Sequence, residues 1–206
     1  MTSEPIIFVV DDDQAMRTSL KWLIESTGMQ VRTFDSADAF LAAYYPGCAG
    51  CLLLDVRMPG MSGLELQNYM AREGYRLPVI IITGHGDVGM AVKAMKAGAA
   101  DFIEKPFHDE DLLGSIRNAL VLDERRRVTQ TNRVEIAARL AELTPREHEI
   151  MGMVTEGKSN KEMAAALGVS TKTVEAHRAR VMEKMRAESL AELVRMALVV
   201  AGESSV

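Results

Sequence analysis

The first 120 residues alternate between short apolar runs and longer segments in which apolar positions recur with helical spacing. The apolar runs are rich in β-branched residues. Three of them, "IIFVV", "LLLD" and "VIII", do not alternate with polar residues, which is typical of parallel strands buried on both faces. We predict strands at 5–10, 30–34, 51–56, 78–83 and 101–104, and helices at 14–27, 36–44, 64–72, 88–97 and 109–122. Five strands alternating with five helices predict an α/β fold, a doubly wound parallel sheet with helices on both faces.

The strand pattern disappears in the second half of the chain. Segment 123–140 is rich in charge, and we interpret it as a helical linker. Beyond it, Thr144 can cap a helix that has Pro145 at its first position and Glu147 at its third, a capping box. Further helices are predicted at 160–167, 171–185 and 189–199. The predicted organisation is an α/β domain at 1–122, the linker at 123–140 and an all-α four-helix domain at 141–206.

The composition is that of an ordinary soluble globular protein, with 48% hydrophobic and 26% charged residues among 206. An apolar run of about 18 residues is missing, as is a basic segment ahead of an apolar N-terminal core, so we expect a cytoplasmic protein without membrane contact. Cys48 and Cys51 form a single CxxC pair. A zinc site needs about four ligands, so we interpret both as small buried residues and leave a redox role open.

Charge is distributed unevenly along the chain. Residues 1–120 carry 10 basic and 16 acidic residues, whereas 121–206 carry 14 and 13. Segment 157–186 carries seven basic and three acidic residues. The overall net charge of −5 argues against a general polyanion binder, but it leaves room for a local basic surface in the second half.

Polar residues stand at the ends of four of the predicted strands. They are Asp11 and Asp12, Asp55, Thr83 and Lys105. Because the carboxyl ends of parallel strands meet at one edge of the sheet, we expect these side chains to lie close together. Neighbouring carboxylates repel one another unless a cation lies among them, and Mg²⁺ prefers oxygen ligands. The pattern therefore predicts a magnesium site.

A simpler reading is that the acidic run Asp11–Asp13 only caps the helix that begins at Gln14, where the helix dipole favours anions. One of the three acids can serve this purpose. Capping does not explain Asp55 or Lys105 at the ends of other strands.

The segments "VVDDD", "LLLDVRMPGMSGLEL", "LPVIIITGHGD" and "AMKAGAADFIEKPF" together resemble the receiver domain of bacterial response regulators, over residues 5–122. The resemblance implies that Asp55 accepts a phosphoryl group from a cognate sensor histidine kinase. It also implies that Asp12, Asp55 and the backbone carbonyl of Arg57 bind Mg²⁺ directly, and that Asp11 binds it through water.

The same resemblance gives roles to three further residues. Lys105 and the hydroxyl of Thr83 would contact the phosphoryl group, and Phe102 matches the aromatic that moves when Thr83 is drawn inward. The Lys105–Pro106 bond matches one that is usually cis. A phosphatase acting through an aspartyl phosphate is the competing interpretation. Such an enzyme needs a substrate cap and an acid/base Asp near its nucleophile, and the sequence after Asp55 offers neither, so we expect no enzyme.

The second half contains the spacing of a helix-turn-helix. Two crossing helices need a small residue where they meet, a glycine at the sharp turn and a branched apolar residue in the second helix. These positions are occupied by Ala164, Gly168 and Val174, respectively. With Val174 facing inward, Val181 and Met185 lie on the same side of the second helix. Its outward side would meet base edges in the major groove, with Glu175 accepting from cytosine. The predicted DNA contacts are Lys161, Lys172, Thr173, Glu175, Ala176, Arg178, Ala179, Arg180 and Lys184.

The charged outer side is also compatible with a plain helical protein-interaction module. However, segment 143–185 resembles the four-helix DNA-binding domain of the LuxR/NarL group, over residues 141–200. The order of domains, with "TGHGDV" and "MKAGAADFIEKPF", most resembles the FixJ branch of response regulators.

The resemblance implies a phosphorylation-dependent switch. Phosphorylated receivers would form a homodimer through the fourth helix and fifth strand, at 88–97 and 100–103. The dimer would bind promoter DNA and act with RNA polymerase, as an activator of transcription. A repressor and a phospho-dependent adaptor that binds protein are the alternatives. The kinase, signal, regulated genes and operator are not specified by the sequence.

Overall fold

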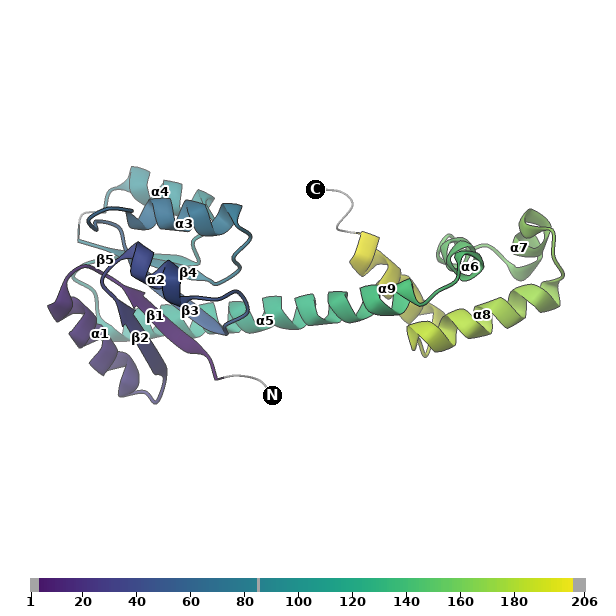
Figure 1. Ribbon diagram of the computed structural model, residues 1–206, viewed down its shortest axis with the longest axis horizontal. Helices are drawn as coiled ribbons and strands as arrows, with labels where there is room; N and C mark the ends of the chain where they lie inside the picture. Colours follow the sequence, from purple (N-terminus) through teal and green to yellow (C-terminus); the bar gives the residue numbers. More distant parts are fainter. Residues whose placement is uncertain (1–3, 85, 202–206) are drawn as a thin grey trace. The chain divides into compact units, whose positions relative to one another are not determined.

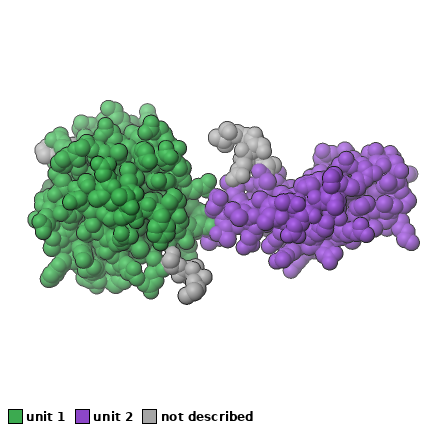
Figure 2. Space-filling model, in the orientation of Figure 1, with its two compact units in different colours: residues 1–127 green, residues 128–206 purple. Residues whose placement is uncertain are grey.

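The protein is described by a computed structural model that covers residues 4–84 and 86–201 (Figure 1). The chain divides into two compact units, residues 1–127 and residues 128–206 (Figure 2). The division falls within the predicted linker. No helix in the described ranges is both long enough and apolar enough to cross a bilayer.

The first unit is built on a five-stranded parallel sheet with the strand order β2-β1-β3-β4-β5. The strands are β1 (Ile6–Val10), β2 (Gln30–Phe34), β3 (Gly50–Asp55), β4 (Val79–Thr83) and β5 (Asp101–Glu104), each within one residue of its predicted bounds. The connection from β2 crosses over β1, so the direction of winding changes between β1 and β3. The carboxyl ends of β1 and β3 therefore meet at the centre of one edge.

Helices cover both faces of this sheet (Figure 1). On one face, α1 (Gln14–Glu25) and α5 (Asp109–Ala141) pack on Ile7 and Val9. On the other face, α2 (Ala37–Ala43), α3 (Gly63–Arg72) and α4 (Val88–Lys96) pack on Phe8 and Val10. All four of these strand residues are at most 1% exposed, because successive side chains of a strand point to opposite faces. The predicted two-sided burial is confirmed for β1, β3 and β4.

Helix α5 is longer than predicted. Its expected end at 122 was too early, since the helix continues without interruption to Ala141. The added segment contains neither Gly nor Pro, and strong helix formers such as Arg, Glu and Ala are frequent in it. Its last part joins the core of the second unit through Ile136, which is 2% exposed.

The second unit contains the four predicted helices, α6 (Pro145–Thr155), α7 (Asn160–Leu167), α8 (Thr171–Met185) and α9 (Leu190–Ala201). The capping box at Thr144 forms as predicted, with Pro145 in the first turn. Gly168 closes α7 in the left-handed conformation, with φ 65°, and this conformation turns the chain sharply into α8.

Candidate functional site

The sheet itself brings the predicted site residues to one edge. Strands β1 and β3 pair in parallel with Val10 opposite Leu54, so Asp11 and Asp55 follow at the same level of neighbouring strands. Thr83 is the last residue of β4, and Lys105 follows β5 directly. These residues belong to four different strands, and their proximity results from the parallel register.

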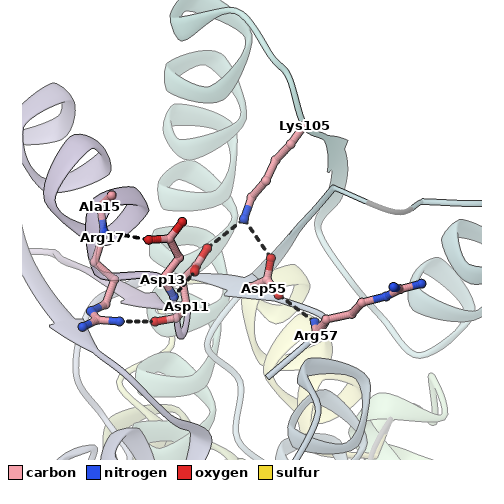
Figure 3. A network of polar contacts seen from close by, with 7 residues as sticks. All are labelled: Asp11, Asp13, Ala15, Arg17, Asp55, Arg57 and Lys105. Atoms are coloured by element: carbon pink, nitrogen blue, oxygen red, sulfur yellow. Dashed lines mark hydrogen bonds and ion pairs between the residues drawn. The ribbon is translucent and has the colours of Figure 1, made fainter. Parts of the chain in front are cut away.

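Lys105 connects the two acids. Its Nζ lies 2.8 Å from Asp11 Oδ2 and 2.8 Å from Asp55 Oδ1 (Figure 3). Both carboxylates are largely withdrawn from water, with side-chain exposures of 4% and 9%, and the lysine side chain is 18% exposed. Burial alone would lower the pKa of Lys105, but the hydrogen bonds and charges of the two acids raise it above its ordinary value. The ammonium therefore stays charged and offsets part of the negative charge of the two acids.

Backbone groups hold the two carboxylates in place. Asp55 Oδ2 accepts a hydrogen bond from the backbone N–H of Arg57 at 2.6 Å, and Asp11 Oδ1 accepts one from that of Asp13 at 2.9 Å (Figure 3). The guanidinium of Arg17 donates to the backbone carbonyl of Asp11 at 2.7 Å. Each acid thus has one oxygen bound to the backbone and the other turned toward Lys105.

The third predicted acid is placed differently. Asp12 is exposed, and Asp13 is the N-cap of α1, where it accepts from the backbone N–H of Ala15 at 2.8 Å. The capping interpretation therefore holds for Asp13 and for neither Asp11 nor Asp55. Among residues 4–84 and 86–201, no group of three or more His, Cys, Asp or Glu side chains is arranged to hold a metal. Asp11, Asp12 and Asp55 are thus not gathered into one three-acid cluster, and their joint role as metal ligands stays a prediction.

Thr83 and Phe102 lie beside each other near the same loop. Thr83 is 1% exposed, and Phe102 packs partly buried against the core. A methyl group on Gly86 would lie 3.1 Å from the Phe102 ring and 3.4 Å from the Thr83 methyl. Thr83 and Phe102 therefore both border the space beside Gly86. The Lys105–Pro106 bond is cis, as the resemblance implied.

Helix α8 presents two contrasting sides. Val174, Val181 and Met185 are at most 1% exposed and lie in the core of the second unit. The opposite side is exposed and includes the predicted contacts Lys172, Thr173, Glu175, Ala176, Ala179 and Arg180. Ser170 caps this helix by accepting from the backbone N–H of Thr173 at 3.1 Å. The predicted orientation of the helix is therefore the observed one.

Three other predicted DNA contacts differ in their surroundings. Lys161 is exposed on α7. Arg178 is partly buried and donates to the side-chain oxygen of Asn160. Lys184 donates to Glu147 at 2.7 Å and to the backbone carbonyl of Glu142 at 3.1 Å. The ammonium of Lys184 is thus already paired within the protein, while its contact with DNA stays a prediction.

Glu147 is a structural residue that the sequence placed in a cap but not in an ion pair. Its side chain is 3% exposed. The hydrogen bond from Lys184 and that from the backbone N–H of Thr144, at 2.8 Å, lower its pKa to about 2. It therefore ties the start of α6 to the end of α8. The partners are 37 positions apart in the chain, so no local pattern indicates the pair.

Asp123 is a second residue that the sequence analysis missed. It lies on α5, is 6% exposed, and accepts from the backbone N–H of Gly50 at 3.1 Å. Burial raises its pKa, while that hydrogen bond and the two nearby arginines oppose the rise. Beside it, burial and the charge of Asp123 raise the pKa of the Cys51 thiol to about 12. A thiol that is 0% exposed and so weakly acidic is not a reactive one.

Comparison with known proteins agrees with both halves of this description. The family model of the response regulator receiver domain matches residues 7–117, and that of the luxR family of bacterial regulatory proteins matches residues 141–197. The transcriptional regulatory protein FixJ of Bradyrhizobium diazoefficiens is 48% identical over 96% of this chain and 97% of its own length. Nodulation protein W of the same organism is 46% identical over 95% and 86%.

Solved structures show the same architecture. The response regulator StyR is 41% identical, with a TM-score of 0.85 over 95% of this chain and 99% of its own. Full-length FixJ from B. japonicum is 45% identical, with a TM-score of 0.58 over 98% and 99%. These matches agree with the acids and lysine at the edge of the sheet and with the exposed side of α8. They show that the chain belongs to the response regulators of the FixJ type, which are phosphorylation-activated transcriptional regulators with a receiver and a LuxR-family DNA-binding domain.

Proposed function

We propose that Asp55 is the residue phosphorylated by a cognate sensor histidine kinase, and that its phosphorylation switches on promoter binding and transcription. The observation that carries this proposal is the ammonium of Lys105, which lies 2.8 Å from one oxygen of Asp55 and 2.8 Å from one oxygen of Asp11. A carboxylate nucleophile held beside a fixed cation is the arrangement that phosphoryl transfer to an acid requires.

In the proposed reaction, Asp55 Oδ1 attacks the phosphorus of a phosphohistidine. The O–P bond forms while the N–P bond breaks, and the imidazole nitrogen leaves with the electron pair and takes up a proton. Lys105 would move from the Asp55 carboxylate to a phosphoryl oxygen, a shift that requires only a small movement of its ammonium. The Thr83 hydroxyl would donate to another phosphoryl oxygen, and Phe102 would move with Thr83 because both side chains border the space beside Gly86.

The types of ligand present support binding of Mg²⁺. Asp11 and Asp55 are buried carboxylates that both face the ammonium of Lys105, and Mg²⁺ is commonly bound by one or two carboxylates together with water. Asp12, Asp55 and the backbone carbonyl of Arg57 would hold the ion directly, and Asp11 would hold it through water. When bound, the ion would neutralise charge between the carboxylates and the incoming phosphoryl oxygens.

Helix α4 supports homodimer formation by the phosphorylated receiver. Val88, Val92 and Met95 are 82%, 45% and 49% exposed. Their spacing of four and three places them along one side of the helix. Strand β5 lies next to α4 and is an edge strand of the sheet. An exposed apolar stripe beside a sheet edge is a surface that a second copy could cover.

A dimer would present two copies of α8 to two half-sites of promoter DNA. The basic residues around α8 would contact phosphates, and its exposed side would contact bases. We assign the bound dimer to activation through RNA polymerase. Transcription in vitro from a bound promoter tests this assignment, because the phosphorylated protein should raise transcript yield, whereas a fall would make it a repressor.

The central experiment treats the full chain with acetyl phosphate and Mg²⁺, and follows gel filtration and intact mass. Wild type should gain one phosphoryl group and shift to a dimer. Asp55→Asn should do neither, because an amide is not a nucleophile. Asp38→Asn changes an exposed acid in the first turn of α2 and should behave as wild type. If the Asp55→Asn variant gains the phosphoryl group as well as wild type does, the assignment is overturned.

A further inference from the structure

An asparagine links the two helices of the helix-turn-helix. Asn160 is the first residue of α7, and its amide lies between two side chains of α8. Its Nδ2 donates to Glu175 Oε1 at 3.4 Å, and its Oδ1 accepts from the guanidinium of Arg178. Asn160 therefore joins an acid and a base that lie three residues apart on the outer part of α8.

The backbone on both sides of this bridge is firmly placed. Ser159 caps α7, and Glu162 completes a capping box by accepting from the Ser159 backbone N–H at 2.8 Å and from its hydroxyl at 2.7 Å. Met163 on α7 and Val174 on α8 are both 0% exposed in the shared core. The position from which Asn160 reaches α8 is thus set by packing and capping.

Glu175 is an unusual residue for a surface that meets DNA. Phosphates repel its carboxylate, so its approach is favourable only if it accepts a hydrogen bond from a base amine, and cytosine N4 is the partner that suits it. A free glutamate side chain would also lose rotamer entropy on forming such a bond. The bridge reduces both costs, because Asn160 restrains one carboxylate oxygen and Arg178 brings positive charge close. The other oxygen, Oε2, is left for a base.

We propose that Asn160 is a positioning residue for base readout, which holds Glu175 so that its carboxylate accepts from the N4 amine of a cytosine in each half-site. This inference rests on the proposed binding of DNA. It places one element of sequence specificity in the contact between α7 and α8, although Asn160 itself need not touch a base.

The first test selects bound duplexes from a random pool, with the full chain phosphorylated by acetyl phosphate and Mg²⁺. Wild type should enrich a cytosine at one position of each half-site. Glu175→Ala should lose this enrichment and Asn160→Ala should reduce it, and both variants should keep the base preferences at all other positions. Lys161→Ala is the matched control, since it removes an exposed side chain next to Asn160. It should weaken binding to all sequences and leave the cytosine preference intact.

The second test measures competition between two duplexes that differ only at that base pair. Wild type should discriminate by about 10-fold, and Glu175→Ala by less than about 2-fold. Asn160→Ala should fall between them, and adding it to Glu175→Ala should change nothing further, because it acts through Glu175. Asn160→Asp is nearly isosteric and keeps the acceptor for Arg178, but it replaces the donor with a repelling charge. It should discriminate less than Asn160→Ala.

The outcomes separate this inference from the function on which it rests. If wild type selects no sequence at all, DNA readout fails and the inference fails with it. If wild type selects a cytosine through Glu175 but Asn160→Ala and Asn160→Asp discriminate as well as wild type, only the positioning role is overturned. A uniform loss of affinity in both Asn160 variants, with unchanged preference, would also overturn it, because that result indicates a merely structural or phosphate contact.

Discussion

Replacement of Lys105 by Met tests the electrostatics of the site most directly. Methionine keeps the length and apolar stem of the lysine side chain but removes its charge. In wild type the ammonium donates to Asp11 and Asp55, each at 2.8 Å. The variant leaves two largely buried carboxylates side by side without a cation, so we expect a large loss of stability in the first unit at pH 7.

The magnitude follows from the contacts. Each charge-assisted hydrogen bond contributes about 1.5–3 kcal/mol, which gives roughly 3–6 kcal/mol for the pair. Release of the lysine side chain returns up to about 2 kcal/mol of rotamer entropy. The 18% exposure of that side chain allows water to solvate part of the site, and this solvation favours the lower end. The expected loss is about 2 kcal/mol.

Mg²⁺ should reverse part of this loss. The ion would compete with Lys105 for the acids in wild type, but not in the variant, so the variant should bind it more tightly and gain more stability from it. The contribution of Lys105 to the stability of the wild-type protein also depends on pH. Since its folded pKa is raised, its stabilisation is complete below the unfolded pKa of about 10.4 and is lost only as pH rises through the folded value.

Hydrogen exchange in peptides from β3 provides the measurement, because amides in a buried central strand exchange through unfolding of their own unit. The exchange rates of these peptides are measured with and without Mg²⁺. Lys21→Met is the control, since it removes an exposed pair with Glu25 at 3.8 Å and should cost less than about 0.5 kcal/mol. Equal stability of Lys105→Met and Lys21→Met would refute the electrostatic reasoning. If Mg²⁺ stabilises Lys105→Met no more than it stabilises wild type, the proposed competition between Mg²⁺ and Lys105 for the acids is refuted.

Three further predictions concern other parts of the molecule. Cys51 should resist alkylation by iodoacetamide in the native protein and react only after denaturation, because burial raises the pKa of its thiol to about 12; rapid native labelling would contradict this. The stabilisation from Glu147, whose pKa is lowered to about 2, should be complete above about pH 4.5 and lost as pH falls toward 2. Glu147→Gln should therefore flatten the pH dependence of hydrogen exchange in α6, and an unchanged slope would show that the acid does not titrate there. Gly50→Ala should prevent accumulation of folded protein in a solubility and circular dichroism assay, because its methyl would lie 1.8 Å from the carbonyl oxygen of Ile6. Gly28→Ala, with φ 82° but open space around it, should cost only about 1 kcal/mol, and similar losses for both would count against a steric cause.

The sheet and the residues at its edge could be predicted from sequence because both follow from local patterns. A non-alternating apolar run indicates a strand buried on both faces, and the residue after it must lie at the strand's end. Asp11, Asp55, Thr83 and Lys105 could therefore be assigned to one edge without knowledge of any contact. The rotamers could not be assigned. That Lys105 bridges Asp11 and Asp55 while Asp12 faces solvent depends on side-chain packing.

Contacts between residues that are far apart in the sequence could not be predicted, for a related reason. Asp123 pairs with Gly50 across 73 positions, and Glu147 with Lys184 across 37. In each case the sequence signal was local, a charged helix face or a capping box, and it gave no partner. The predicted linker is helical as expected, but its helix is continuous with the one predicted at 109–122. A charged segment without Gly or Pro remains a good helix when its apolar residues, such as Ile136, find a core.

The receiver can act as a switch only if the phosphoryl group makes contacts in one state that it lacks in the other. The arrangement around Lys105 explains how such a difference can arise. Without phosphorylation, the ammonium of Lys105 is engaged by Asp11 and Asp55. An acyl phosphate on Asp55 would add negative charge and move the best position for the ammonium outward, and Thr83 could then become a donor to the same group. Thr83 and Phe102 both border the space beside Gly86, so a movement of the threonine would change the space open to the aromatic ring. The elements that would respond are β5, which carries Phe102, and α4, which lies next to β5. A few kcal/mol of redistributed electrostatic energy is enough to convert a minor state into the major one.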